Sequence, residues 1–131
     1  MNKDQRPEIE IAVPAEAAYL AVLRTAAAGL ATRLDFTLDD IEDLRIAVDE
    51  ACSILLGQAV RGSHLLCRFH LGGDALTVVV AVESAKPTIP TRHGFAWTVL
   101  SALASSVDFA VTDPRHLEIT LVQRRPTAAV H

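Results

Sequence analysis

The sequence predicts a two-layer α/β sandwich, in which a mixed β-sheet carries three helices on one face. Its 131 residues suit a single domain that is large enough to bury a core. Apolar and polar residues alternate in five short segments, which indicates strands that need cover on one face only. Three longer segments repeat their apolar residues at helical spacing. The predicted order of elements is β-α-α-β-β-α-β-β.

The first predicted elements are a strand and an Ala-rich helix. Ile9, Ile11 and Val13 fall on one side of the strand, and Pro14 ends it. The helix covers residues 15–33, and its apolar residues recur at helical spacing: Tyr19, Leu20, Leu23, Ala27 and Leu30.

The second helix is the best-defined element of the chain. Thr37 resembles the start of a capping box, and Asp39 and Asp40 follow it in the first turn. The free N–H groups and the positive dipole end of a helix favour carboxylates at this position. The apolar stripe then runs as far as Gly57 through Ile41, Leu44, Val48, Ala51 and Leu55.

A hairpin, a third helix and two strands complete the prediction. Gly72-Gly73-Asp74 turns the hairpin, and the two strands beside it have core sets of Leu65, Cys67, Phe69 and Leu71, and of Leu76, Val78, Val80 and Val82. The third helix, from about Gly94 to Ser106, is expected to bury Phe95, Val99, Leu103 and Val107. The last strands are predicted at residues 108–111 and 117–123. We expect one domain over residues 8–125, with a flexible arm at 1–7 and a disordered tail at 126–131.

Composition excludes several classes of protein. The formal net charge of −4 argues against a nucleic-acid binder. No stretch approaches the roughly 18 apolar residues of a membrane helix, and the first residues lack a signal peptide, so we expect a cytoplasmic protein without a membrane partner. Cys52 and Cys67 are expected to be buried apolar residues, and a redox-sensing role is the alternative.

Motifs for independent catalytic or metal chemistry are absent from the sequence. The five histidines, none in a metal-binding spacing, are His64, His70, His93, His116 and His131. We therefore predict no metal site. No nucleophile elbow and no glycine-rich phosphate loop of the Walker kind occurs either.

Two segments carry a resemblance to a known family. The run Leu-Arg-Ile-Ala-Val-Asp-Glu-Ala at 44–51 resembles the motif helix of the serine-kinase anti-sigma factors, the RsbW/SpoIIAB-like family. The segment 94–103 resembles that family's second glycine box and the helix after it. The family belongs to the histidine-kinase-like ATPase (GHKL) superfamily. The resemblance spans residues 8–123 and implies the Bergerat, or histidine-kinase-like ATPase, fold.

The resemblance implies a catalytic role for Glu50, as a base or positioning group. In the family, an Asn four residues after this Glu holds magnesium, but here the matching residue is Ile54. Magnesium prefers oxygen ligands, and an isoleucine side chain has none.

The nucleotide boxes also depart from the family pattern. Glu83 stands where the resemblance implies an adenine-binding Asp, and Ala85 and Pro87 replace glycines. The second box keeps Gly94 but has Ala96 in place of a glycine, and residues 88–93 are too few for a typical ATP lid. Glu83 and Gly94 are therefore interpreted as vestigial nucleotide-binding residues, and ATP and magnesium are disfavoured as cofactors.

Three functions follow from the resemblance. The first is an anti-sigma factor, a homodimer that sequesters a sigma factor and is released by a STAS-type anti-anti-sigma antagonist. The second is an active ATP-dependent serine kinase of that antagonist, and the third is a degenerate partner-switching adaptor.

Three local alternatives also stay open. Arg92 beside Gly94 could attract an anion or merely precede a helix, Trp97 could be core or interface, and the acids at 39–43 could be solvated or could meet a basic partner.

Overall fold

The computed structural model describes residues 6–125 and confirms the predicted order of elements. The first part comprises β1 (Ile9–Pro14), the short 3-10 helix η1 (Ala17–Tyr19), α1 (Leu20–Arg33) and α2 (Leu38–Leu56). The second part comprises β2 (His64–Gly72), β3 (Ala75–Glu83), α3 (Phe95–Leu103), β4 (Ser106–Thr112) and β5 (His116–Arg124). The expected tail at 126–131, and all but two residues of the expected arm, lie outside the described residues.

The five strands form one sheet in the order β1-β2-β3-β5-β4. All four neighbouring pairs are antiparallel, so the expectation of a mixed sheet is wrong. The reason is the position of β5. The connection through α3 joins β3 to β4, which run in the same direction, but β5 lies between them and is antiparallel to both.

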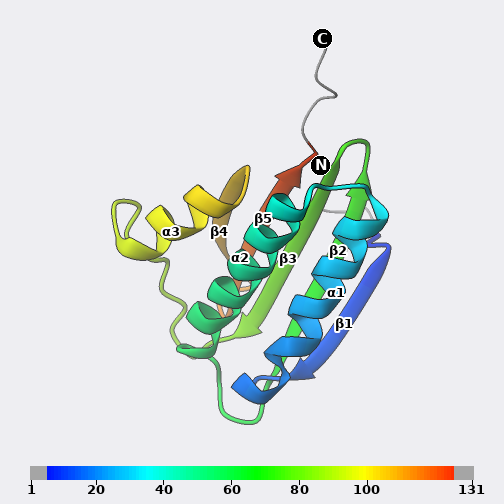
Figure 1. Cartoon of the computed structure of the whole chain (residues 1–131). Coiled ribbons are helices and arrows are strands. Elements are labelled where there is room, and N and C mark those ends of the chain that lie inside the picture. Colours follow the sequence, from blue (N-terminus) through cyan, green and yellow to red (C-terminus); the bar gives the residue numbers. More distant parts are fainter. Residues whose placement is uncertain (1–5, 126–131) are drawn as a thin grey trace.

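Three helices cover one face of the sheet, as predicted (Figure 1). The helix α2 lies between α1 and α3, contacts both, and packs on β3 and β5. The core between the two layers is formed by the alternate residues of each strand and the inner faces of the helices. Its largest fully buried side chains include Leu23, Leu44, Leu55, Phe69 and Ile119.

The helix α2 begins as its sequence predicts. The Thr37 hydroxyl accepts a hydrogen bond from the backbone N–H of Asp40 at 3.1 Å, which satisfies one of the free donors of the first turn. The predicted stripe faces the core, with Leu44, Val48 and Leu55 fully buried.

The helix α3 is shorter than predicted and buries a different face. Phe95, expected in the core, is 80% exposed, and Val107 belongs to β4. The helix buries Trp97 and Leu100 instead. The ring of Trp97 lies 4.6 Å from that of Phe109 on β4, centroid to centroid, because α3 packs over this edge of the sheet.

The other face of the sheet has no helix over it in the described part of the chain. An ion pair crosses the central strand β3 on this face, from Arg68 on β2 to Glu118 on β5 at 3.1 Å. Val79 and Ala81 of β3 are only 8% and 7% exposed. Long charged side chains therefore screen much of the apolar surface that the open face would present. None of the described helices has the length and apolar character needed to cross a membrane.

Candidate functional site: the outer flank of α2 and the loop before α3

The middle of α2 carries Glu50, the catalytic candidate. Glu50 is half-buried and shares a flank of the helix with Asp43 and Ile54, because residues four and seven apart lie on one side. This flank points away from α1, whose Arg24 pairs with the neighbouring Asp49 on the other side of α2. Ile54 is partly buried and packs against the hydrophobic core. The position where the resemblance implies a magnesium ligand therefore presents only carbon atoms.

The structure does not bring Glu83 together with Glu50. Side chains alternate along β3, so Glu83 lies on the face of the sheet away from the helices, where it lines a hollow of about 280 Å³ with His64 and His116. Its carboxylate pairs with Arg115 at 3.3 Å. The residue at this strand end that faces the helices is Val82, which is 1% exposed and belongs to the core. An aliphatic side chain cannot accept a hydrogen bond from an adenine amino group.

Hydrogen bonds hold the loop between β3 and α3 near its start and in its middle. Near its start, the buried Ser84 donates its backbone N–H to the Arg115 carbonyl at 2.7 Å and accepts from the Lys86 N–H at 3.3 Å. In its middle, the side-chain amide of Gln58 donates to the Thr88 carbonyl at 2.7 Å and accepts from the Thr88 N–H at 2.9 Å. The residue after the segment that corresponds to the first glycine box is thus tied to Gln58, two residues beyond the end of α2.

The Trp97 side chain holds the end of the same loop. Its indole N–H donates to the Pro90 carbonyl at 2.8 Å, and the Arg92 guanidinium lies 4.7 Å from the ring centroid, in a cation–π contact. Trp97 is 8% exposed, so it is a core residue in this structure. The sequence does not reveal these contacts, because loop and helix meet only through tertiary packing.

Gly94 forms the N-cap of α3. Its N–H donates to the Thr91 carbonyl at 2.8 Å, so this donor is already used within the loop. A Cβ at Gly94 would lie 3.0 Å from the Thr91 oxygen, a distance tighter than ordinary contacts, which explains a glycine here. The Gly94 amide therefore cannot donate to an anion without breaking this bond.

Both cysteine thiols are buried near the centre of the domain. Burial, helped by the negative charge of Asp49, raises the pKa of Cys52 from 9.0 to about 12. Burial likewise raises the pKa of Cys67 on β2, chiefly through loss of solvation. Thiolates are the reactive form of cysteine, so the burial and raised pKa of both thiols favour the structural interpretation over redox sensing. Within residues 6–125, no three His, Cys, Asp or Glu side chains are arranged to hold a metal ion.

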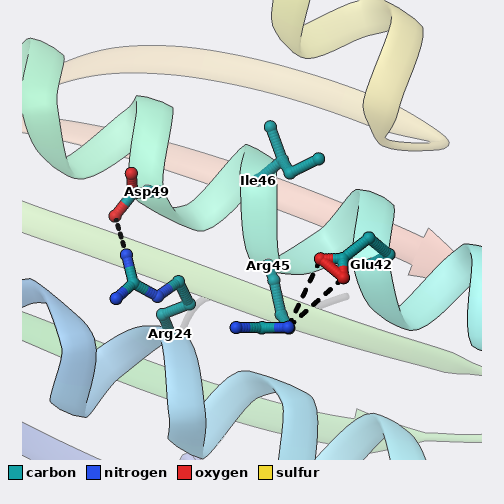
Figure 2. Close-up of a pocket in the computed structure, with 5 residues that line it drawn as sticks. All are labelled: Arg24, Glu42, Arg45, Ile46 and Asp49. Carbon is teal, nitrogen blue, oxygen red and sulfur yellow. Dashed lines mark hydrogen bonds and ion pairs between the residues drawn. The ribbon is translucent and has the colours of Figure 1, made fainter.

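A second feature is a groove between α1 and α2, which sequence reasoning missed. Figure 2 shows Arg24 of α1 reaching Asp49 of α2 at 2.8 Å, and Arg45 folding onto Glu42 of its own helix at 3.2 Å. With Ile46, these residues line an open hollow of about 210 Å³. The Arg24–Asp49 pair joins residues 25 positions apart, so only the packing of the two helices brings it together.

Comparison with known proteins supports the family resemblance. No protein-family model matches the chain. The chain is 40% identical over 81 residues to the serine-protein kinase RsbW of Halalkalibacterium halodurans. The aligned region covers 61% of this chain and 50% of that relative. The chain is 38% identical over 84 residues to the serine-protein kinase RsbW of Bacillus subtilis, covering 62% and 52%. The chain thus spans about half the length of the curated relatives it matches.

A solved structure agrees at the level of the fold. A crystal structure of the RsbU and RsbW domains of a Mycobacterium tuberculosis protein superposes with a TM-score of 0.69, over 94% of this chain and 34% of that one. The sequence identity is 18%, so this match concerns the fold alone. Together, these similarities confirm the resemblance to the RsbW/SpoIIAB-like family that the α2 motif predicts, and the α/β sandwich that goes with it.

Proposed function

We propose that this chain is an anti-sigma factor that sequesters a sigma factor by protein–protein binding, without ATP-dependent kinase activity. An anti-anti-sigma antagonist of the STAS type releases the sigma factor. The similarity to RsbW proteins supports the class of function. Sigma factors act in transcription, so this proposal requires the chain to work in the cytoplasm.

One observation carries the loss of kinase activity. On the flank of α2 that holds Glu50, the side chain one turn further on is Ile54, packed on the core. Val82 presents a second aliphatic group at the helix-facing end of β3. The residues present do not fit a magnesium nucleotide, because neither position offers the oxygen that a magnesium ion or an adenine ring would need. Capture of a sigma factor needs no hydrolysis, so these replacements leave binding possible.

The relatives favour a second function. Both relatives named above are called serine-protein kinases, and Glu50 is present in the helix that resembles the family motif. An active kinase would transfer phosphate from ATP to a serine of the antagonist. This alternative requires magnesium nucleotide to bind despite Ile54.

The test uses the purified chain, each sigma factor encoded in the same genome, and each STAS-domain protein beside it. We expect one sigma factor to bind equally well with and without magnesium ATP, and labelled ATP to transfer no phosphate to any STAS protein. RsbW of Bacillus subtilis with its own antagonist is the positive control for transfer. Failure of every sigma factor to bind would refute the anti-sigma proposal, and phosphate transfer would support the kinase.

The resemblance also implies a homodimer. We propose that the chain dimerises, and light scattering on the purified protein tests this directly. A single species at the monomer mass of 14.1 kDa over a wide concentration range would refute it.

A further inference from the structure

The outer surface of α1 and α2 is a helix face with no partner within the described structure. The sheet covers only the inner side of the two helices (Figure 1). Three large apolar side chains nevertheless point to solvent here: Leu38 is 84% exposed, Val22 48% and Ile46 46%. Leu38, Glu42 and Ile46 follow at intervals of four and so form one stripe on α2.

The hollow between the helices lies beside this stripe and is already formed. Ile46 lines it, and the Arg24–Asp49 pair ties its two walls together at 2.8 Å (Figure 2). The side chains of this pair are 34% and 43% exposed, so the pair adds little to stability, and the spacing of the walls is set by the core that α1 and α2 share. A preformed groove loses less conformational entropy when a partner binds.

The charged side chains that line the groove balance one another, and the outer side of α2 beside it carries a negative excess. The helix α2 carries six acidic residues and a single basic one, Arg45, while α1 has two arginines and no acid. Within the groove, Arg45 and Arg24 are each paired with an acid. The negative excess lies on the solvent side of α2, at the exposed Asp39 and, on the flank away from α1, at Asp43 and Glu50, and it favours a cationic partner along this helix.

We propose that the groove between α1 and α2 binds a basic amphipathic helix of the sigma factor. This inference rests on the proposed function for the identity of the partner. The apolar side of the helix lies along Leu38 and Ile46 and inserts a side chain into the hollow, as in other helix-in-groove interfaces. Its Lys and Arg residues lie near the acids of α2. An acidic helix would meet like charges there.

The first experiment needs no knowledge of the sigma factor. A synthetic amphipathic helix of about five turns, with Leu on one face and Lys on the other, is titrated into the isotope-labelled full chain while amide NMR signals are followed. We expect shifts confined to residues of α1 and α2, weakening with added salt. A matched peptide with Glu in place of Lys should cause none. Shifts on the open sheet face or at α3 instead, or equal shifts with both peptides, would overturn the proposal.

The second experiment compares matched variants of the chain in binding to the same peptide. Leu38→Ser removes an apolar side chain that is 84% exposed, and Phe95→Ser removes one that is 80% exposed on α3. Leu38→Ser should weaken binding of the Lys peptide about tenfold, while Phe95→Ser should leave it within about twofold. Glu42→Gln should also weaken binding, whereas Asp108→Asn on β4 should not. Thermal melts check that each variant is folded.

The same variants separate this inference from the proposed function. If a sigma factor binds the chain and Leu38→Ser and Glu42→Gln weaken that complex, both are supported. If the sigma factor binds both variants as tightly as it binds the wild type, the groove is not the binding site, and the anti-sigma function stands. If no sigma factor binds while the Lys peptide still occupies the groove, the function is wrong and the groove binds another basic helix.

Discussion

Replacing Leu55 by alanine tests whether α2 is the central support of the core. Leu55 is fully buried, on the inner face of the helix that packs on β3 and β5. The change removes about three carbon groups, worth about 2 kcal/mol of transfer free energy. The cavity left behind raises the expected loss in the free energy of unfolding to about 3 kcal/mol. Leu38→Ala on the same helix is the control, because Leu38 is 84% exposed, and should change stability by less than about 0.5 kcal/mol.

Urea unfolding followed by fluorescence measures both variants. Trp97 is the single tryptophan and is 8% exposed, so its emission reports loss of the core. With a urea dependence of about 1.5 kcal/mol per molar, Leu55→Ala should lower the midpoint by about 2 M. A loss below about 1 kcal/mol, or an equal effect of Leu38→Ala, would refute the assigned inner face of α2.

Further predictions concern the cap, the loop and the thiols. Thr37→Ala should cost about 1 kcal/mol of unfolding free energy and Thr37→Ser much less, as urea curves will show. Trp97→Phe loses the bond to Pro90 and should cost about 1 kcal/mol by circular dichroism in urea. The pKa of both thiols is raised by folding, so the unfolded chain loses these protons first. The contribution of Cys52 to stability is therefore complete below pH 9.0 and declines between 9.0 and about 12. The free energy of unfolding, measured by urea curves at rising pH, should therefore fall less steeply above pH 9.0 in Cys52→Ala and in Cys67→Ala than in the wild type.

Much of the fold could be predicted from local pattern. The Thr37 cap and the stripe of α2 follow from interactions within one turn or one face, which sequence spacing encodes. Strand pairing is different, because the insertion of β5 between β3 and β4 depends on contacts distant in sequence. The inner face of α3 was not predictable either. Its nine residues, FAWTVLSAL, are apolar on several sides, so the edge of the sheet decides which are buried.

The position of Glu83 relative to the helices could have been predicted from the sequence. The alternation that puts Val78, Val80 and Val82 in the core also turns Glu83 to the opposite face, so the sequence already argues against pairing Glu83 with Glu50. The ties from Gln58 to Thr88 and from Trp97 to Pro90 were not predictable. Both bonds end on backbone atoms of the loop, and every residue has such atoms, so no sequence pattern marks the partner.

The central claim is that this chain does not bind magnesium ATP, because α2 has Glu50 but carries Ile54 where a magnesium ligand would be needed. Calorimetric titration of magnesium ATP into the purified chain, with RsbW of Bacillus subtilis titrated in parallel, measures this directly. We predict no saturable heat with this chain up to about 1 mM nucleotide. Saturable binding with a Kd in the micromolar range, abolished when magnesium is withheld, would contradict the claim.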